Sequence, residues 1–181
     1  MTPYVTQPAD LGVPPRVPCD SGWVTQTPLL DSQIGLAHLT YRAALAIAAE
    51  HGARLPTREI VLRLHELATE AGTELAPVIL PGASPSLVES GAKPGDPAMS
   101  SWIWCATHDA LVLPRMRALV KRYPNNFVAN AGKHWISPCP AGQAAICGWW
   151  LNEHFIQEGL GPVHNDLHSD YATTTVLWWP A

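Results

Sequence analysis

Residues 39–60 read LTYRAALAIAAEHGARLPTREI, and this stretch predicts two helices joined by a short turn. Thr40 is a suitable N-cap, and Leu39 in front of it can pack against the first turn of the helix. The apolar residues that follow recur at helical spacing, and Gly52 allows the left-handed conformation that ends many helices. The sequence therefore predicts a first helix over residues 41–51.

A second helix is expected directly after this turn. Thr57 can cap it, Pro56 keeps Leu55 extended, and Gly72 can end the helix in the same way as Gly52. The apolar residues that share one face of this helix are Ile60, Leu64, Leu67, Ala68 and Ala71. Both helices therefore have an apolar face with which to pack on the rest of the chain.

The run from Leu39 to Glu59, with the RLPT turn of residues 54–57, resembles a segment of the formylglycine-generating-enzyme family. Members of that family have a C-type-lectin-like fold, in which such a turn joins a first and a second helix. The resemblance implies this fold for the present chain. It implies less about activity, because the tryptophan that the family carries after the turn is replaced by Val61-Leu62-Arg63 and the catalytic cysteines of the family cannot be placed.

The half of the chain beyond residue 100 predicts mainly strands, because β-branched and aromatic residues are concentrated there. The expected strands cover residues 101–106, 127–129, 133–136, 144–151 and 173–179, with one helix over 110–122 and loops at 137–142 and 159–162. We therefore predict an α+β fold in which two N-terminal helices pack on a mostly antiparallel, tryptophan-rich sheet. The C-type-lectin-like arrangement is what the resemblance adds to this prediction.

Length and composition predict one globular domain over residues 1–181. Its hydrophobic fraction is 47% and its charged fraction 14%, which is typical of a folded protein. Residues 1–22 are rich in proline and should form an extended arm, and residues 77–98 should form a Pro/Gly-rich loop.

The charge pattern and the absence of long apolar runs limit the partners and the location. The net charge is −4 and no basic run occurs, so we expect no nucleic-acid partner. No apolar run is long enough for a transmembrane helix, and the first residues lack a secretory signal, so we expect a cytoplasmic protein without membrane attachment. The four cysteines form no CxxC pair and should be reduced thiols, although Cys139 and Cys147 could cross-link a hairpin.

The densest chemistry of the chain lies in residues 164–171, which read HNDLHSDY. His164, Asp166, His168 and Asp170 occupy alternate positions, so in an extended segment all four side chains share one face. In a helix the two histidines would still be neighbours, because they are four residues apart. Two imidazoles therefore converge with at least one carboxylate in either conformation.

Such a set of nitrogen and oxygen ligands suits zinc. We expect His164 and His168 to bind the metal together with Asp170 or Asp166, and bound zinc would lower the pKa of a water molecule to about 7. Asp166 or Asp170, whichever does not ligate, would act as general base or orient an imidazole. The alternative is that the segment is a solvated polar loop in front of the last strand.

Three further groups of residues could take part in catalysis. His134, in a predicted strand, is the most suitable catalytic helper, although an isolated histidine in such a strand is more often an ordinary core or surface residue. A cysteine nucleophile at Cys147, preceded by Gln143, resembles papain-like enzymes in residue order only, because the spacing is too short. His108 and Asp109 rank lower, because adjacent side chains diverge on a helix.

Aromatic side chains are the candidate substrate-binding residues, namely Trp149, Trp150 and Tyr171. Adjacent tryptophans in a strand point to opposite faces, so some indoles should be exposed and able to stack on sugars or anchor a protein. The sequence thus predicts a metal-dependent hydrolase acting on a cell-wall peptide or glycan such as peptidoglycan. The alternative is a non-enzymatic C-type-lectin-like module that binds carbohydrate or protein.

Overall fold

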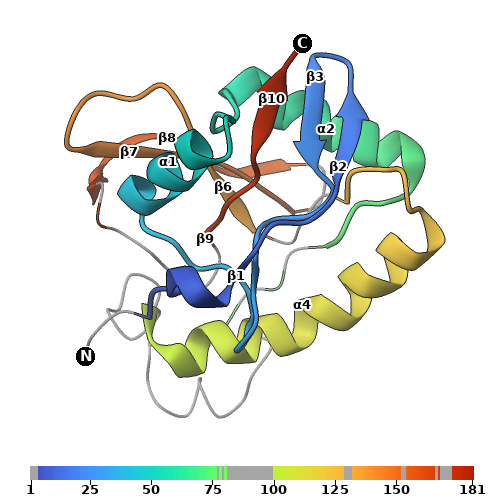
Figure 1. The fold of residues 1–181 in the computed structure, drawn as a ribbon, viewed down its shortest axis with the longest axis horizontal. Coiled ribbons are helices and arrows are strands. Elements are labelled where there is room, and N and C mark those ends of the chain that lie inside the picture. The colour runs from blue at the N-terminus through green and yellow to red at the C-terminus, as the bar shows by residue number, and fades with distance from the viewer. Residues whose placement is uncertain are drawn as a thin grey trace.

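The computed structural model describes residues 4–76, 78, 80, 100–128, 132–151, 154–165, 167 and 173–181. For residues 149–151 and 154–165 this description covers the backbone alone. Within it, three α-helices and three small sheets form an α+β fold (Figure 1). The predicted fold class is therefore correct at this level.

The two helices predicted at residues 39–72 are confirmed as α1 (Tyr41–Glu50) and α2 (Arg58–Ala71). The hydroxyls of Thr40 and Thr57 each accept the backbone N–H three residues further on, at 3.2 and 3.4 Å. Gly72 adopts the left-handed conformation, with φ of 68°, and ends α2. These boundaries follow from the local cap residues.

The helix expected over residues 110–122 is confirmed as the second half of α4 (Trp102–Arg122), which begins eight residues earlier than expected. The strand predicted at residues 101–106 is wrong, because this segment is the start of α4. Two of the positions that α4 buries hold polar residues, His108 and Asp109, which interrupt the apolar periodicity of the sequence. In Figure 1, α4 runs along one side of the molecule and is longer than α1 or α2.

The strands form three sheets in place of the single predicted sheet. The first contains β1 (Leu11–Gly12), β4 (Leu30–Asp31) and β5 (Gly35–Leu36) in the order β1-β4-β5. The second contains β2 (Arg16–Cys19), β3 (Gly22–Thr25) and β10 (Trp178–Pro180) in the order β10-β3-β2. The proline-rich N-terminal segment thus supplies strands to both, after a short 3-10 helix, η1 (Pro8–Asp10).

The third sheet has the order β8-β7-β6-β9 and contains β6 (Lys133–Ile136), β7 (Gln143–Leu151), β8 (His154–Asn165) and β9 (Thr173–Thr174). Its strands pair antiparallel except β6 and β9, which are parallel. The predicted hairpin of residues 133–151 is confirmed as β6 and β7.

Three of the expected elements beyond residue 126 differ from the structure. The loop predicted at 159–162 is wrong, because these residues belong to β8. Phe127 and Val128 lie outside any strand, and the strand predicted over 173–179 is split into β9 and β10. The sequence signals for strands were therefore right for residues 133–136, 144–151 and parts of 173–179, and wrong for residues 101–106 and for Phe127 and Val128.

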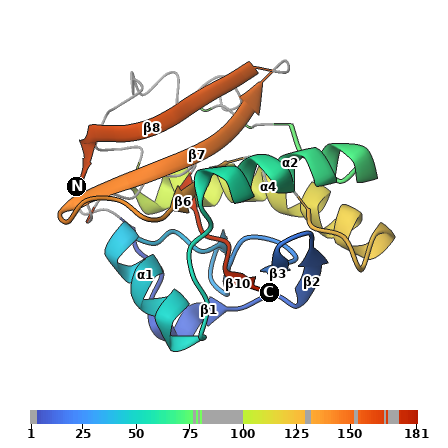
Figure 2. The ribbon, with the colours of Figure 1, turned by 90° about the horizontal axis from the view of Figure 1, so that it is seen from above.

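Trp135 of β6 is the centre of one hydrophobic core. It is fully buried, its ring packs edge-on against Tyr41 of α1 with centroids 5.6 Å apart, and its indole N–H donates to the carbonyl of Leu39 at 2.9 Å. On the same sheet, α2 packs against β6 and β7, and Figure 2 shows α2 beside these strands. A second core lies under α4, around Trp104 and Met116.

All four cysteines are free. Cys105 and Cys147 are buried, whereas Cys19 and Cys139 are partly exposed. The expected loop at 77–98 lies outside the described residues except for Val78 and Leu80, which are buried. In the described part of the chain, no helix combines the length and the apolar character needed to cross a bilayer.

Candidate functional site

Of the predicted His/Asp motif at residues 164–171, the structure describes only residues 164, 165 and 167. His164 lies in β8, where the description covers the backbone and not the imidazole. Asp166, His168, Asp170 and Tyr171 lie outside the described residues. The zinc ligands and catalytic carboxylates expected there therefore stay predictions.

The same holds for two of the expected substrate-binding residues. Trp149 and Trp150 lie in β7, and their side chains are outside the description. Among the described tryptophans, Trp23 and Trp102 are 50% and 55% exposed, whereas Trp179 is buried. Exposed indoles therefore exist on this protein, at positions other than those expected.

The strand order places β9, which follows the motif in the sequence, next to His134. β8 lies at one edge of the third sheet and β9 at the other, and residues 166–172 connect the two strands. β9 begins at Thr173 and pairs with β6, so that Thr174 is opposite His134. The hydroxyl of Thr174 lies 3.3 Å from Nδ1 of His134. The first strand that follows the motif in the sequence therefore pairs beside the expected helper.

His134 is 1% exposed, and this burial lowers its pKa to about 4. Its Nε2 has no hydrogen-bond partner within the described part of the chain. His65 of α2 is also buried, and burial, followed by the nearby His134, lowers its pKa to about 3. Both imidazoles are therefore neutral at physiological pH, which is the state that binds a metal or accepts a proton.

The alternative of a nucleophilic Cys147 is not favoured by its surroundings. Cys147 is paired with His134 across β6 and β7, so the two side chains share a face of the sheet. Burial raises the pKa of its thiol to about 11, whereas an activated cysteine has a lowered pKa. Cys147 is therefore an uncharged residue of the core at neutral pH.

A second polar centre, which the sequence interpretation ranked low and without His38, joins the end of β5 to α4. Asp109 accepts from the backbone N–H of Leu36 at 2.7 Å, and its carboxylate lies 3.2 Å from Nε2 of His38 and 3.1 Å from Nδ1 of His108. The prediction that His108 and Asp109 would diverge is wrong. Because His108 and Asp109 are both fully buried, their polar atoms have few possible hydrogen-bond partners other than each other.

The charges of this centre depend on one another. Burial alone would lower the pKa of His38, but Cys105 and Asp109 outweigh it and raise that pKa well above its usual value. Burial alone would raise the pKa of Asp109, but the hydrogen bonds from His108 and His38 outweigh it and lower the pKa. The order thiol, imidazole and carboxylate is typical of cysteine hydrolases. All these side chains are 0% exposed, so in this conformation the centre fixes α4 in place and does not touch a substrate.

The described part of the structure does not contain a complete set of metal ligands. No group of three or more His, Cys, Asp or Glu residues there is arranged to hold a metal ion. His134 and His65 supply two buried imidazoles, so a metal site near them would need further ligands from residues 164–170.

No family model, curated protein or solved structure matches this chain. The resemblance of residues 39–60 to the formylglycine-generating-enzyme family therefore rests on those residues alone. The function has to be argued from the chemistry of the side chains.

Proposed function

We propose that this protein is a metal-dependent hydrolase, with His164, His168 and Asp170 as zinc ligands and Asp166 as general base. One observation carries the proposal: the neutral, buried imidazole of His134 lies beside the strand into which the His/Asp motif leads. Bound zinc would supply a Lewis acid and a water molecule with a pKa of about 7.

His134 has the features of a residue prepared for proton transfer. The contact between Thr174 and Nδ1 fixes the orientation of its ring, and Nε2 lacks a partner in the described residues. An unsatisfied polar atom in a buried position costs stability, so its presence suggests a use other than packing. In this proposal Asp166 takes the proton from the attacking water, and the neutral imidazole of His134 assists by donating or accepting a hydrogen bond.

The substrate remains as the sequence predicts it, a cell-wall peptide or glycan such as peptidoglycan. The cytoplasmic location and the C-type-lectin-like arrangement of the helices and sheets are likewise parts of this proposal. A hydrolase of this kind can be recognised by release of soluble fragments from purified peptidoglycan.

Metal analysis of the purified protein tests the proposal. We expect about one zinc ion per chain, lost in His168→Ala and in His164→Ala and kept in His51→Ala, whose exposed histidine follows α1. His134→Asn can keep the contact to Thr174, and it should retain the metal while peptidoglycan hydrolysis falls about a hundredfold. Folded protein that takes up no zinc, or His168→Ala with unchanged zinc, would refute a metal centre.

A non-enzymatic binding module is the second candidate, and the exposed indoles of Trp23 and Trp102 favour it. Exposed aromatic rings stack on sugars and anchor protein partners. This function predicts that wild-type protein without metal still binds glycan or protein, and that Trp102→Ala weakens the binding without unfolding the chain. A hydrolase would instead lose its function when the metal is removed.

A further inference from the structure

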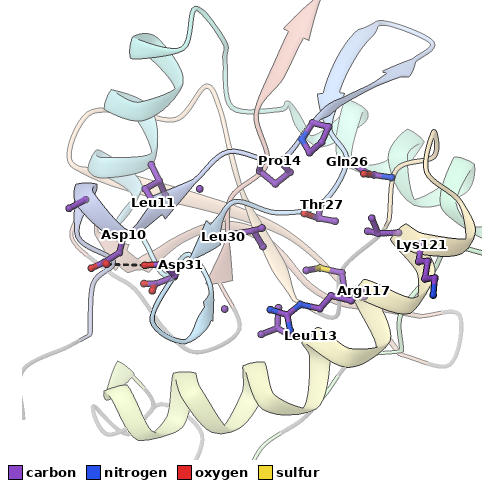
Figure 3. A pocket seen from close by; sticks show the side chains of 17 residues that line it. Asp10, Leu11, Pro14, Gln26, Thr27, Leu30, Asp31, Leu113, Arg117 and Lys121 are labelled. Atoms are coloured by element: carbon purple, nitrogen blue, oxygen red, sulfur yellow. Dashed lines mark hydrogen bonds between the residues drawn. The ribbon is translucent and has the colours of Figure 1, made fainter.

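A pocket of about 630 Å³ lies between the N-terminal segment and α4, away from the third sheet (Figure 3). Its volume is in the range of small-molecule sites. Three stretches line it: residues 9–15, the residues around β4 and the turn to β5, and one face of α4. Its apolar surface comes mainly from Leu11, Pro14, Leu30, Leu113, Met116 and Val120.

The wall between β5 and α4 is held by close packing. Gly35 has φ of 128°, and a Cβ at this position would run into the side chain of Leu113. Immediately next to it, the backbone N–H of Leu36 is bound by the buried carboxylate of Asp109 at 2.7 Å. The pocket is therefore built on a rigid junction and needs little reorganisation to accept a ligand.

The acidic end of the pocket is largely satisfied by the protein. Asp31 is 3% exposed and accepts hydrogen bonds at 2.6–3.3 Å from four donors, the hydroxyls of Tyr4 and Thr6 and the backbone N–H groups of Gln33 and Ile34. Asp10 accepts from the side chains of Ser32 and Gln33 at 2.9 and 3.0 Å, and these bonds lower its pKa. The carboxylate of Asp31 therefore has little capacity left for a cationic ligand, whereas both bonds to Asp10 use Oδ1 and leave Oδ2 open.

At the basic end of the pocket, in contrast, the charged side chains lack such partners among the described residues. Arg117 and Lys121 lie one turn apart on α4, so their side chains are neighbours. Neither forms a hydrogen bond or ion pair with any residue that the structure describes. In Figure 3, Lys121 lies on the side of the pocket opposite Asp10, and the side chain of Arg117 extends from α4 toward Leu113. Unsatisfied positive charge therefore borders an apolar surface.

We propose that this pocket binds a small organic anion with an apolar body, of the class of medium-chain carboxylates. The head group is bound by Arg117 and Lys121, and the guanidinium of Arg117 can form two parallel hydrogen bonds to a carboxylate. The hydrocarbon chain covers Leu30 and Leu113 and removes their surface from water. The site shares no residue with the proposed hydrolase centre, so either proposal can fail without the other.

Isothermal titration calorimetry with octanoate tests this site, with 1-octanol and acetate as matched probes that lack the charge or the chain. We expect octanoate to bind with an affinity that decreases at high salt, and both other probes to bind at least about tenfold more weakly. The double variant Arg117→Gln/Lys121→Gln should weaken octanoate binding about tenfold or more. Arg115→Gln, an exposed residue of α4 that does not line the pocket, should leave it unchanged.

Several outcomes would overturn the proposal. Equal binding of octanol and octanoate would show that the cations do not select the head group. An equal loss of affinity in Arg115→Gln would show general attraction to a basic surface and not a site. Binding to anionic phospholipid vesicles without binding to octanoate would assign Arg117 and Lys121 to a membrane surface. The zinc content should be the same in all these variants, which separates this test from that of the hydrolase.

Discussion

Replacing His65 by glutamine should change how the stability of this protein depends on pH. His65 lies on the buried face of α2, where burial and the nearby His134 lower its pKa from 6.5 to about 3. At about pH 5 the imidazole is therefore neutral in the folded chain and mostly protonated in the unfolded chain. The unfolded chain then binds the extra proton, and folding has to release it.

The sign and the size follow from this difference in proton binding. Because the folded pKa is the lower one, the contribution of His65 to stability falls as the pH drops below 6.5 and continues to fall until about pH 3. At about pH 5 the unfolded imidazole favours the protonated form by about thirtyfold, which corresponds to a loss of about 2 kcal/mol. Any folded pKa below about 4 gives the same value, so the result does not depend on the exact shift.

The buried His38 acts in the opposite direction. Its folded pKa is raised, so its contribution to stability is present below 6.5 and is lost as the pH rises through the folded pKa. The wild-type curve combines both effects, together with that of His134, and is not itself diagnostic. The difference between wild type and His65→Gln isolates the contribution of His65.

Urea unfolding followed by tryptophan fluorescence gives this difference at pH values from about 8 to 5. His65→Gln should lose about 2 kcal/mol less free energy of unfolding over this interval than the wild type. His51→Gln, at an exposed histidine, should run parallel to the wild type. If the curves of His65→Gln and wild type are parallel, the imidazole titrates alike in both states and the argument from burial is wrong.

Three further substitutions test the packing. Asp109→Ala should destabilise the fold by about 3–5 kcal/mol in urea unfolding, because it breaks a fully buried ion pair. The control Asp20→Ala loses only an exposed ion pair with Arg63 and should cost less than about 1 kcal/mol. Gly35→Ala should lower the free energy of unfolding by about 3 kcal/mol or more, because φ at this position is 128° and the added methyl group runs into Leu113 of α4. The control Gly142→Ala, with φ of 75° and open space around it, should lower it by about 1 kcal/mol. Thr57→Ala should lower the stability by about 1 kcal/mol and the helix content measured by circular dichroism, and no change would contradict its role as a cap.

The helices α1 and α2 were predictable because their signals are local. Thr40 and Thr57 cap the first turns through contacts within three residues, and Gly72 ends α2 through its own φ. The hairpin of β6 and β7 follows in the same way from two strand-like runs and the turn between them. Such features need no knowledge of the rest of the chain.

The first part of α4 was misread for the opposite reason. His108 and Asp109 appear as polar residues in a sequence pattern, but the fold buries them; His38 and Leu36 contact the carboxylate of Asp109, which also contacts Nδ1 of His108. A polar residue can occupy a core position only where tertiary contacts supply its partners. The periodicity of one segment does not reveal those partners.

The sequence by itself determined where the caps, the hairpin and the concentration of histidine and aspartate lie, because short-range sterics and hydrogen bonding are set by neighbouring residues. Only the tertiary structure decided which distant groups meet. His38 and Asp109 are 71 residues apart in the chain, and Thr174 and His134 are 40 apart, yet each pair is in contact. The pocket beside α4 likewise exists because burial of apolar surface brings the N-terminal segment onto that helix, a long-range effect that is not encoded at any single position.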